Sequence, residues 1–225
     1  MLNRIFVKYF INTAYPKLKT DQTVAYAITC MEEWKIKHLP VVEKETYKAL
    51  VAEEDLLQFP AETLIKEVIN EVRPPVSIYE NTHIFEAYRV ATQYRLSLLP
   101  VISEKNTFRG VLTQETLFFA FGELLPVNGE YSLIILEMPQ RDQNLSALVH
   151  LVEANNAHIL CYTTQILERG ENILVFLMID LSDPSHVMMS LERFNYKIIY
   201  HSARYAKKDW TSIDRWEELM RYMNI

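Results

Sequence analysis

The stretch Leu39-Pro40-Val41-Val42 recurs as Leu99-Pro100-Val101-Ile102, at an offset of 60 residues. An apolar stripe with the i, i+3, i+4, i+7 spacing of one buried helical face precedes each copy. An internal repeat of this kind predicts two copies of one supersecondary unit that pack against each other. The stripe consists of Val24, Ala27, Ile28 and Met31 in the first copy, and of Ile84, Ala87, Tyr88 and Ala91 in the second.

Each copy continues with a polar turn, a short apolar strand and the start of a helix. In the first copy the strand covers residues 49–52, and Glu53-Glu54-Asp55 follows. In the second copy the strand covers residues 110–113, and the helix begins at Gln114. Each unit is therefore predicted to run strand, helix, strand, turn, strand, helix.

The two copies resemble a tandem pair of CBS (cystathionine-beta-synthase-type) domains, the Bateman module. The family hallmark is an apolar-Pro-Val-Val strand followed by Gly-apolar-apolar-Ser/Thr-x-x-Asp, and residues 1 to about 122 follow it twice. The resemblance implies a homodimer held by the CBS units, and a cleft for an adenine nucleotide of the AMP, ATP, NAD or S-adenosylmethionine class. We expect the first CBS copy at residues 1–60 and the second CBS copy at residues 61–122.

Each copy keeps only half of the second motif, Gly-apolar-apolar-Ser/Thr-x-x-Asp. Asp55 fills the acidic position of the first copy, but Ala52 replaces the hydroxyl. Thr113 is present in the second copy, but Thr116 stands where the acid is expected. Two interpretations stay open: a sensor with altered or single-site nucleotide binding, and a dimeric scaffold with degenerate clefts. The ligand positions implied by the resemblance are Thr20, Lys37, His38, Asp55, Ser77, Ser97, Leu98, Thr113 and Thr116, of which Lys37 and His38 make the first cleft better supplied for an anion.

The pattern changes after a turn-rich join at residues 123–130. Residues 131–202 give the order strand, helix, strand, strand, helix, strand, which is the ferredoxin-like split unit. This domain resembles an ACT domain, and the whole chain resembles the acetoin-utilisation AcuB-type proteins. The resemblance implies an amino-acid site at the first strand-to-helix turn, with Asp142, Asn144 and Leu145; the alternative is that Asp142 or Asn144 only caps the helix.

The C-terminal segment, residues 203–225, has large apolar side chains on one face of a helix expected from about Thr211. The face can dock on the protein's own body or on its dimer mate, or it can hold a client protein. Its members are Trp210, Ile213, Trp216, Leu219, Met220 and Met223.

The chain has 225 residues and only four glycines, no two of them closer than seven positions. A P-loop and a dinucleotide fingerprint are therefore excluded, because both need clustered glycines. The net charge of −6 argues against nucleic acid as a partner, and the longest apolar run, residues 173–179, is too short for a membrane span. No catalytic or metal-binding spacing occurs, and Cys30 and Cys161 lack a CxxC spacing. The sequence predicts a non-enzymatic regulatory protein of the cytoplasm, with no bound metal and no certain cofactor.

Overall fold

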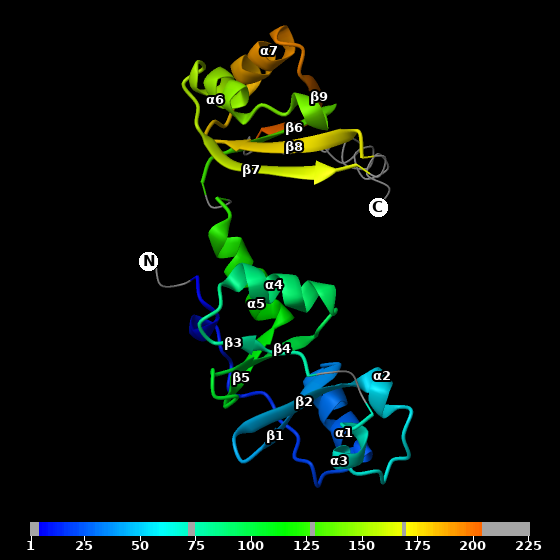
Figure 1. Cartoon of the computed structure of the whole chain (residues 1–225). Helices are drawn as coiled ribbons and strands as arrows, with labels where there is room; N and C mark the ends of the chain where they lie inside the picture. Colours follow the sequence, from blue (N-terminus) through cyan, green and yellow to red (C-terminus); the bar gives the residue numbers. More distant parts are fainter. Residues whose placement is uncertain (1–4, 72–74, 127–128, 168–169, 204–225) are drawn as a thin grey trace. The chain divides into compact units, whose positions relative to one another are not determined.

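The computed structural model describes residues 5–71, 75–126, 129–167 and 170–203 (Figure 1). The chain divides after Leu124 into two compact units. The first unit contains the sequence repeat, and the second contains the predicted split unit. The elements of the first unit are η1 (Val7–Tyr9), α1 (Val24–Trp34), β1 (His38–Glu43), β2 (Thr46–Ala52), α2 (Glu53–Leu56), α3 (Ile65–Val68), β3 (Ile78–Tyr79), α4 (Ile84–Gln93), β4 (Leu98–Ile102), β5 (Phe108–Thr113) and α5 (Gln114–Leu124).

The strands of the two copies match in register. β1 pairs with β2, and β4 pairs with β5, both antiparallel and both with an irregularity after the Val of the Leu-Pro-Val stretch. β3 joins Val101 in parallel through Ile78. The equivalent contact in the first copy is a single parallel bridge between Leu18 and Val41. The expected first strand of the first copy is therefore reduced to one bridge.

The repeat extends to the backbone conformation after the first helix of each copy. Lys35, which ends α1, has φ of 52°, and Arg95, 60 positions later, has φ of 51°. Left-handed residues of this kind end helices by redirecting the chain. Both copies therefore turn into their Leu-Pro strand in the same way.

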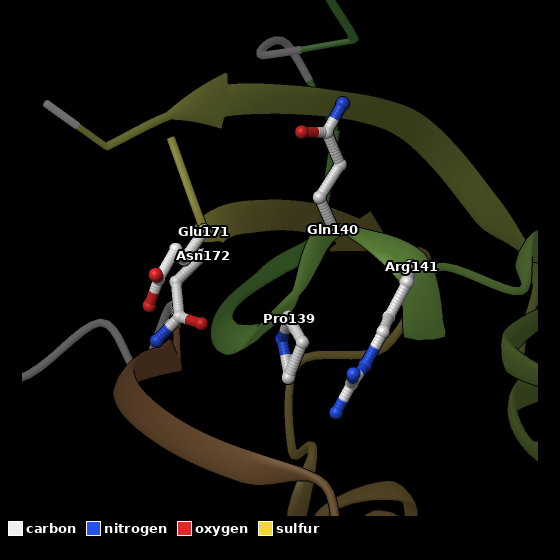
Figure 2. Close-up of a pocket in the computed structure, with 5 residues that line it drawn as sticks. All are labelled: Pro139, Gln140, Arg141, Glu171 and Asn172. Carbon is white, nitrogen blue, oxygen red and sulfur yellow. The ribbon is translucent and has the colours of Figure 1, made fainter. Parts of the chain in front are cut away.

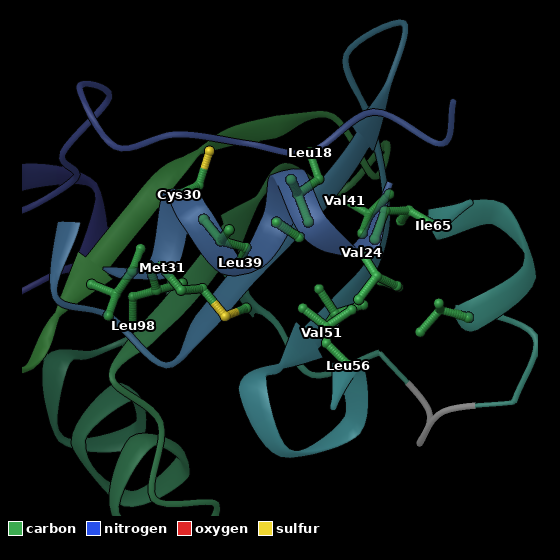
Figure 3. Close-up of a cluster of buried hydrophobic side chains, with 14 of the residues drawn as sticks. Leu18, Val24, Cys30, Met31, Leu39, Val41, Val51, Leu56, Ile65 and Leu98 are labelled. Atoms are coloured by element: carbon green, nitrogen blue, oxygen red, sulfur yellow. The ribbon is translucent and has the colours of Figure 1, made fainter. Parts of the chain in front are cut away.

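The helical stripe of each copy is buried as its spacing predicts, with one difference. Val24, Ala27 and Met31 are buried on α1 in the core of the first copy. Figure 3 shows Val24 and Met31 together with the strand residues Leu39 and Val41. On α4, however, Tyr88 is 42% exposed. Its ring stacks on Phe121 of α5, with centroids 4.7 Å apart. A tyrosine can lie at the edge of an apolar helix face in this way, because its hydroxyl stays in water while its ring is partly covered.

The two copies share core and backbone contacts and therefore form one body. Leu98 of β4 and Val111 of β5 belong to the core cluster of the first copy. At the hairpin tips, the Tyr47 amide donates to the Asn106 carbonyl over 3.1 Å. The Tyr47 hydroxyl donates to the Val76 carbonyl over 2.7 Å, and burial raises the pKa of this tyrosine.

The second unit is a four-stranded antiparallel sheet with the strand order β7-β8-β6-β9. This is the ferredoxin-like order, so the architecture predicted from the sequence, two repeated α+β copies followed by a βαββαβ domain, is confirmed. Both long helices lie on one side of the sheet (Figure 1), where their apolar faces bury the larger core of this unit. Its elements are β6 (Ser132–Pro139), η2 (Gln140–Asp142), α6 (Leu145–Glu153), β7 (Ile159–Ile166), β8 (Asn172–Ile179), α7 (Ser185–Arg193) and β9 (Lys197–Ala203).

A glycine and a proline lie near the ends of two helices. α5 continues through Gly122 to Leu124, so this glycine lies inside a helix. α7 begins at Ser185, directly after Pro184, and the Asp183 carboxylate accepts the Ser185 amide over 3.0 Å. The amphipathic segment after Ala203 lies outside the described residues.

Candidate ligand-binding site of the CBS pair

The residues that precede the two Leu-Pro strands meet between the two copies. The Lys37 amide donates to the Ser97 hydroxyl oxygen over 2.9 Å. That oxygen lies 3.0 Å from Nδ1 of His38, and the Ser97 amide donates to the same nitrogen over 3.2 Å. We call these three residues, Lys37, His38 and Ser97, the central junction. It brings together residues 59 and 60 positions apart in the sequence.

The hydrogen bonds of the central junction fix the state of the His38 ring. Because Nδ1 accepts from the Ser97 amide, it carries no proton, and the neutral ring holds its proton on Nε2. The Ser97 hydroxyl then donates to Nδ1 while its oxygen accepts from Lys37. A charged imidazole is a donor at both nitrogens, so protonation of Nδ1 would break the bond from the Ser97 amide, whereas the contact with the Ser97 hydroxyl would reverse, with Nδ1 donating to the oxygen.

The central junction also contacts the start of the second-motif helix in each copy. The Lys37 carbonyl accepts the Glu53 amide of α2 over 2.9 Å, and the Ser97 carbonyl accepts the Gln114 amide of α5 over 3.3 Å. The second motif of each copy therefore lies beside the residue that precedes its Leu-Pro strand. This is the juxtaposition that the resemblance to CBS domains implied for a ligand cleft.

In the first copy the second motif presents a carboxylate at a helix start. Ala52 precedes α2 and offers no side-chain cap. Asp55 is half-buried in the first turn. Among the hydrogen bonds and ion pairs of the described residues, none involves its carboxylate. A carboxylate of this kind can accept hydrogen bonds from two sugar hydroxyls.

In the second copy the polar groups of the motif bind each other. The Thr113 hydroxyl accepts the Thr116 amide over 3.1 Å, and the two hydroxyl oxygens lie 2.9 Å apart. Thr113 is buried and acts as the cap of α5, a role typical of Thr before a helix. This arrangement leaves the second copy without an acid at the position that Asp55 fills in the first.

The three remaining candidates lie apart from the central junction or within the core. Thr20 donates to the Glu43 carboxylate over 3.3 Å. Glu43 ends β1, which His38 begins, so Thr20 contacts the opposite end of this strand from the central junction. Leu98 is 1% exposed and packs in the core, so only its backbone can contact a ligand. Ser77 is half-buried just before β3.

The predicted amino-acid turn of the second unit is partly used by the fold. The Asn144 side chain accepts the Ala147 amide over 3.1 Å and caps α6. Leu145 is 44% exposed at the start of that helix. Asp142 lines a pocket of about 460 Å³ together with Glu137, Asn172 and Lys197.

A second pocket, of about 670 Å³, lies beside the first and is lined by Pro139, Gln140, Arg141, Glu171 and Asn172 (Figure 2). Figure 2 shows Arg141 and Asn172 as sticks on facing segments of its wall. Sequence reasoning missed Glu137, whose carboxylate bonds Lys197 and accepts the Asn172 amide over 2.9 Å. The sequence feature that could have identified Glu137 is that it is the one charged residue in the apolar strand β6.

No cluster of three or more His, Cys, Asp or Glu side chains with metal-binding geometry occurs among the described residues. Within the same residues, no helix has the length and apolar character needed to cross a bilayer.

The fold and the central junction define a module of two paired, repeated domains. The family model described as CBS domain matches residues 7–62 and 65–123, just over half of the chain. The chain belongs to the CBS-domain family, and the predicted tandem pair is confirmed.

Solved structures are similar to about half of the chain. One is a CBS domain pair/ACT domain protein from Thermotoga maritima, with 21% identity over 54% of this chain and 99% of that chain, and a TM-score of 0.49. Another is CBSX2 in complex with AMP, with 19% identity, 53% and 98% coverage, and a TM-score of 0.47. A third is a putative acetoin utilization protein (AcuB) from Vibrio cholerae, with 21% identity, 53% and 92% coverage, and a TM-score of 0.46.

Proposed function

We propose that the chain is a non-enzymatic regulatory protein that binds an adenine nucleotide at the CBS pair, in the cleft of the first copy. The observation that carries the proposal is the central junction, which lies against the helix start that presents Asp55. Lys37 is exposed there and supplies a positive charge for phosphate. The carboxylate of Asp55 supplies the acceptor for ribose hydroxyls.

The same reasoning disfavours the cleft of the second copy. Thr116 replaces the acid, and its hydroxyl lies in hydrogen-bonding distance of Thr113. A ligand would have to break this contact and would gain a neutral partner in place of a carboxylate, and hydrogen bonds to a charged group are about twice as strong. We therefore propose one nucleotide site per chain.

Thermal unfolding of the full chain with AMP, ATP, NAD and S-adenosylmethionine tests this function. A ligand present at 100 times its Kd should add about 2.7 kcal/mol to the free energy of unfolding, which raises the melting temperature. The Asp55→Ala variant should lose this rise, whereas Glu54→Ala, which removes a neighbouring acid of the same helix, should keep it. If no nucleotide raises the melting temperature at millimolar concentration, the proposal is wrong for these ligands.

A dimeric scaffold is the second candidate, and exposed side chains of the first unit support it. The equivalent positions Leu57 and Phe118 are 70% and 72% exposed, and Trp34 and Tyr94 are 44% and 46% exposed. Both copies thus present large apolar groups at matching places of their helices. Matching apolar patches of this kind fit a self-complementary interface with a second copy of the chain.

We further propose that the second unit is an ACT-like domain and that the chain acts in the cytoplasm as an AcuB-like protein. The βαββαβ order and the free cysteines Cys30 and Cys161 support this assignment. An amino-acid site at the turn of Asp142 to Leu145 is the weaker alternative, because Asn144 already caps α6. A panel of amino acids in the thermal assay, with Asp142→Ala, would reveal such a site.

A further inference from the structure

The sheet of the second unit has an apolar face on the side opposite α6 and α7. Its side chains form a cluster separate from the core that the helices cover, and we call this cluster the far face. Ile135 and Leu174 at its centre have no exposed surface, and the others are partly buried. The far face comprises Leu133, Ile135, Leu167, Leu174, Phe176, Ile199 and Tyr200.

The sequences of the two central strands require a cover on this side. β6 contains Leu-Ile-Ile-Leu and β8 contains Ile-Leu-Val-Phe-Leu-Met-Ile, with no alternation of apolar and polar residues. Continuous apolar strands are typical of sheets buried on both faces, whereas a sheet with one solvated face alternates. The edge strand β7, in contrast, is half-buried or exposed along its length. The far face is thus a strip along the central strands and β9.

One end of the far face is polar, which sets the length of the strip. Glu137 of β6 pairs with Lys197 of β9 in the sheet register and forms an ion pair with it. Asn172 of β8 donates to the same carboxylate over 2.9 Å. The apolar strip therefore extends from this ion pair toward Leu133, near the strand end at which β9 stops.

We propose that the far face is covered by the C-terminal segment of the same chain, residues 204–225. β9 ends at Ala203, paired with Ser132, one residue from Leu133. The following 22 residues therefore start at the apolar end of the strip. The spacing of Trp210, Ile213, Trp216, Leu219 and Met223 predicts an amphipathic helix.

Length and connectivity favour this occupant over a separate molecule. A helix over residues 211–225 is about 22 Å long at 1.5 Å per residue. A strand of eight residues, such as β8, is about 26 Å long, so the helix can run along the strip. A tethered segment also has an effective concentration in the millimolar range, which a second copy or a client must exceed.

Tryptophan fluorescence of the full chain tests the proposal, because two of the three tryptophans, Trp210 and Trp216, lie in the segment. In a Trp34→Phe background, with excitation selective for tryptophan, all tryptophan emission comes from the segment. We expect blue-shifted emission and protection from acrylamide that do not change on dilution. Phe176→Ser on the far face should shift the emission to the red and increase quenching several-fold. Met189→Ser, at a 65% exposed site on α7, should leave both unchanged.

Each other outcome overturns the proposal. Emission typical of water-exposed tryptophan in the Trp34→Phe protein would show that the segment is not docked. Protection that is lost on dilution, together with a halved mass, would assign the cover to a second copy. Protection that survives both Phe176→Ser and Leu133→Ser, in variants whose circular dichroism shows a retained fold, would place the segment elsewhere.

Discussion

Asp180 holds the ends of two strands together at the edge of the second sheet. Its carboxylate accepts the His158 amide over 2.6 Å and lies 2.7 Å from the His158 ring nitrogen Nδ1. His158 precedes β7 and Asp180 follows β8, and the Asp180 amide donates back to the His158 carbonyl over 3.1 Å. The bond from the His158 amide is the main reason why the pKa of Asp180 is lowered from its ordinary value of 3.8.

The lowered pKa predicts an acid-dependent contribution to stability. The unfolded chain takes up the proton first, so the contribution is complete above pH 3.8 and is lost as the pH falls from there through the folded pKa. Asp180→Asn should lower the urea midpoint at pH 7 and should remove this part of the acid dependence. Urea titrations from pH 7 to pH 3 measure both effects, with the exposed Glu192→Gln as the control. An unchanged midpoint at pH 7 would contradict the assignment.

The sequence predicted which residues belong to the candidate site, but only partly which of them contact each other. The repeat placed Lys37 and Ser97 at equivalent positions before their strands, with His38 next to Lys37. It did not show that the Ser97 hydroxyl joins the two copies, because that contact depends on how the copies pack. The mutual bond of Thr113 and Thr116 was also hidden, since the sequence shows only a missing acid.

At the scale of elements, Gly110 is required by the crossing of two chain segments. Its φ of 142° lies in the region that favours glycine, and a Cβ there would lie 2.5 Å from Ile11 Cγ2 and 2.7 Å from the Asn12 carbonyl oxygen. The segment at Asn12 pairs with Val111 of β5, so it cannot move away freely. The glycine of the second motif thus serves close packing of the chain.

The two glycines of the first unit should respond oppositely to alanine. Gly110→Ala should destabilise the protein by more than about 1 kcal/mol, because both the backbone angle and the space are unsuitable. Gly122→Ala should stabilise it by up to about 1 kcal/mol, since Gly122 lies within α5 and a Cβ there meets nothing within 4 Å. Chemical denaturation of both variants measures the difference. Equal effects would contradict this account of Gly110.

The elements themselves followed closely from apolar periodicity. The helices α1 and α4 appear where the stripes predict them, and the helices and sheet order of the second unit agree with the predicted βαββαβ sequence. The lengths of the second-motif helices did not follow. α2 has 4 residues and α5 has 11. The proline that follows each helix start comes early in the first copy, where Pro60 lies 7 positions after Glu53, and later in the second, where Pro126 lies 12 positions after Gln114.

At the scale of the whole molecule, the exposed apolar groups on both CBS copies predict a homodimer. A double variant, Leu57→Asp with Phe118→Asp, should place charges at the interface and convert the dimer to a monomer. Sedimentation equilibrium measures the mass. Met189→Asp, at an equally exposed apolar site of the second unit, should leave the dimer intact. A dimer that survives the double variant would assign the interface to another surface.

The central claim is that the chain binds one adenine nucleotide, in the first CBS copy. Calorimetric titration of the full chain with AMP and with ATP tests it most directly, because it measures both affinity and stoichiometry. We expect saturable binding of one nucleotide per chain, lost in Asp55→Ala and retained in Thr116→Val. Binding that persists in Asp55→Ala, or that disappears in Thr116→Val, would contradict the claim.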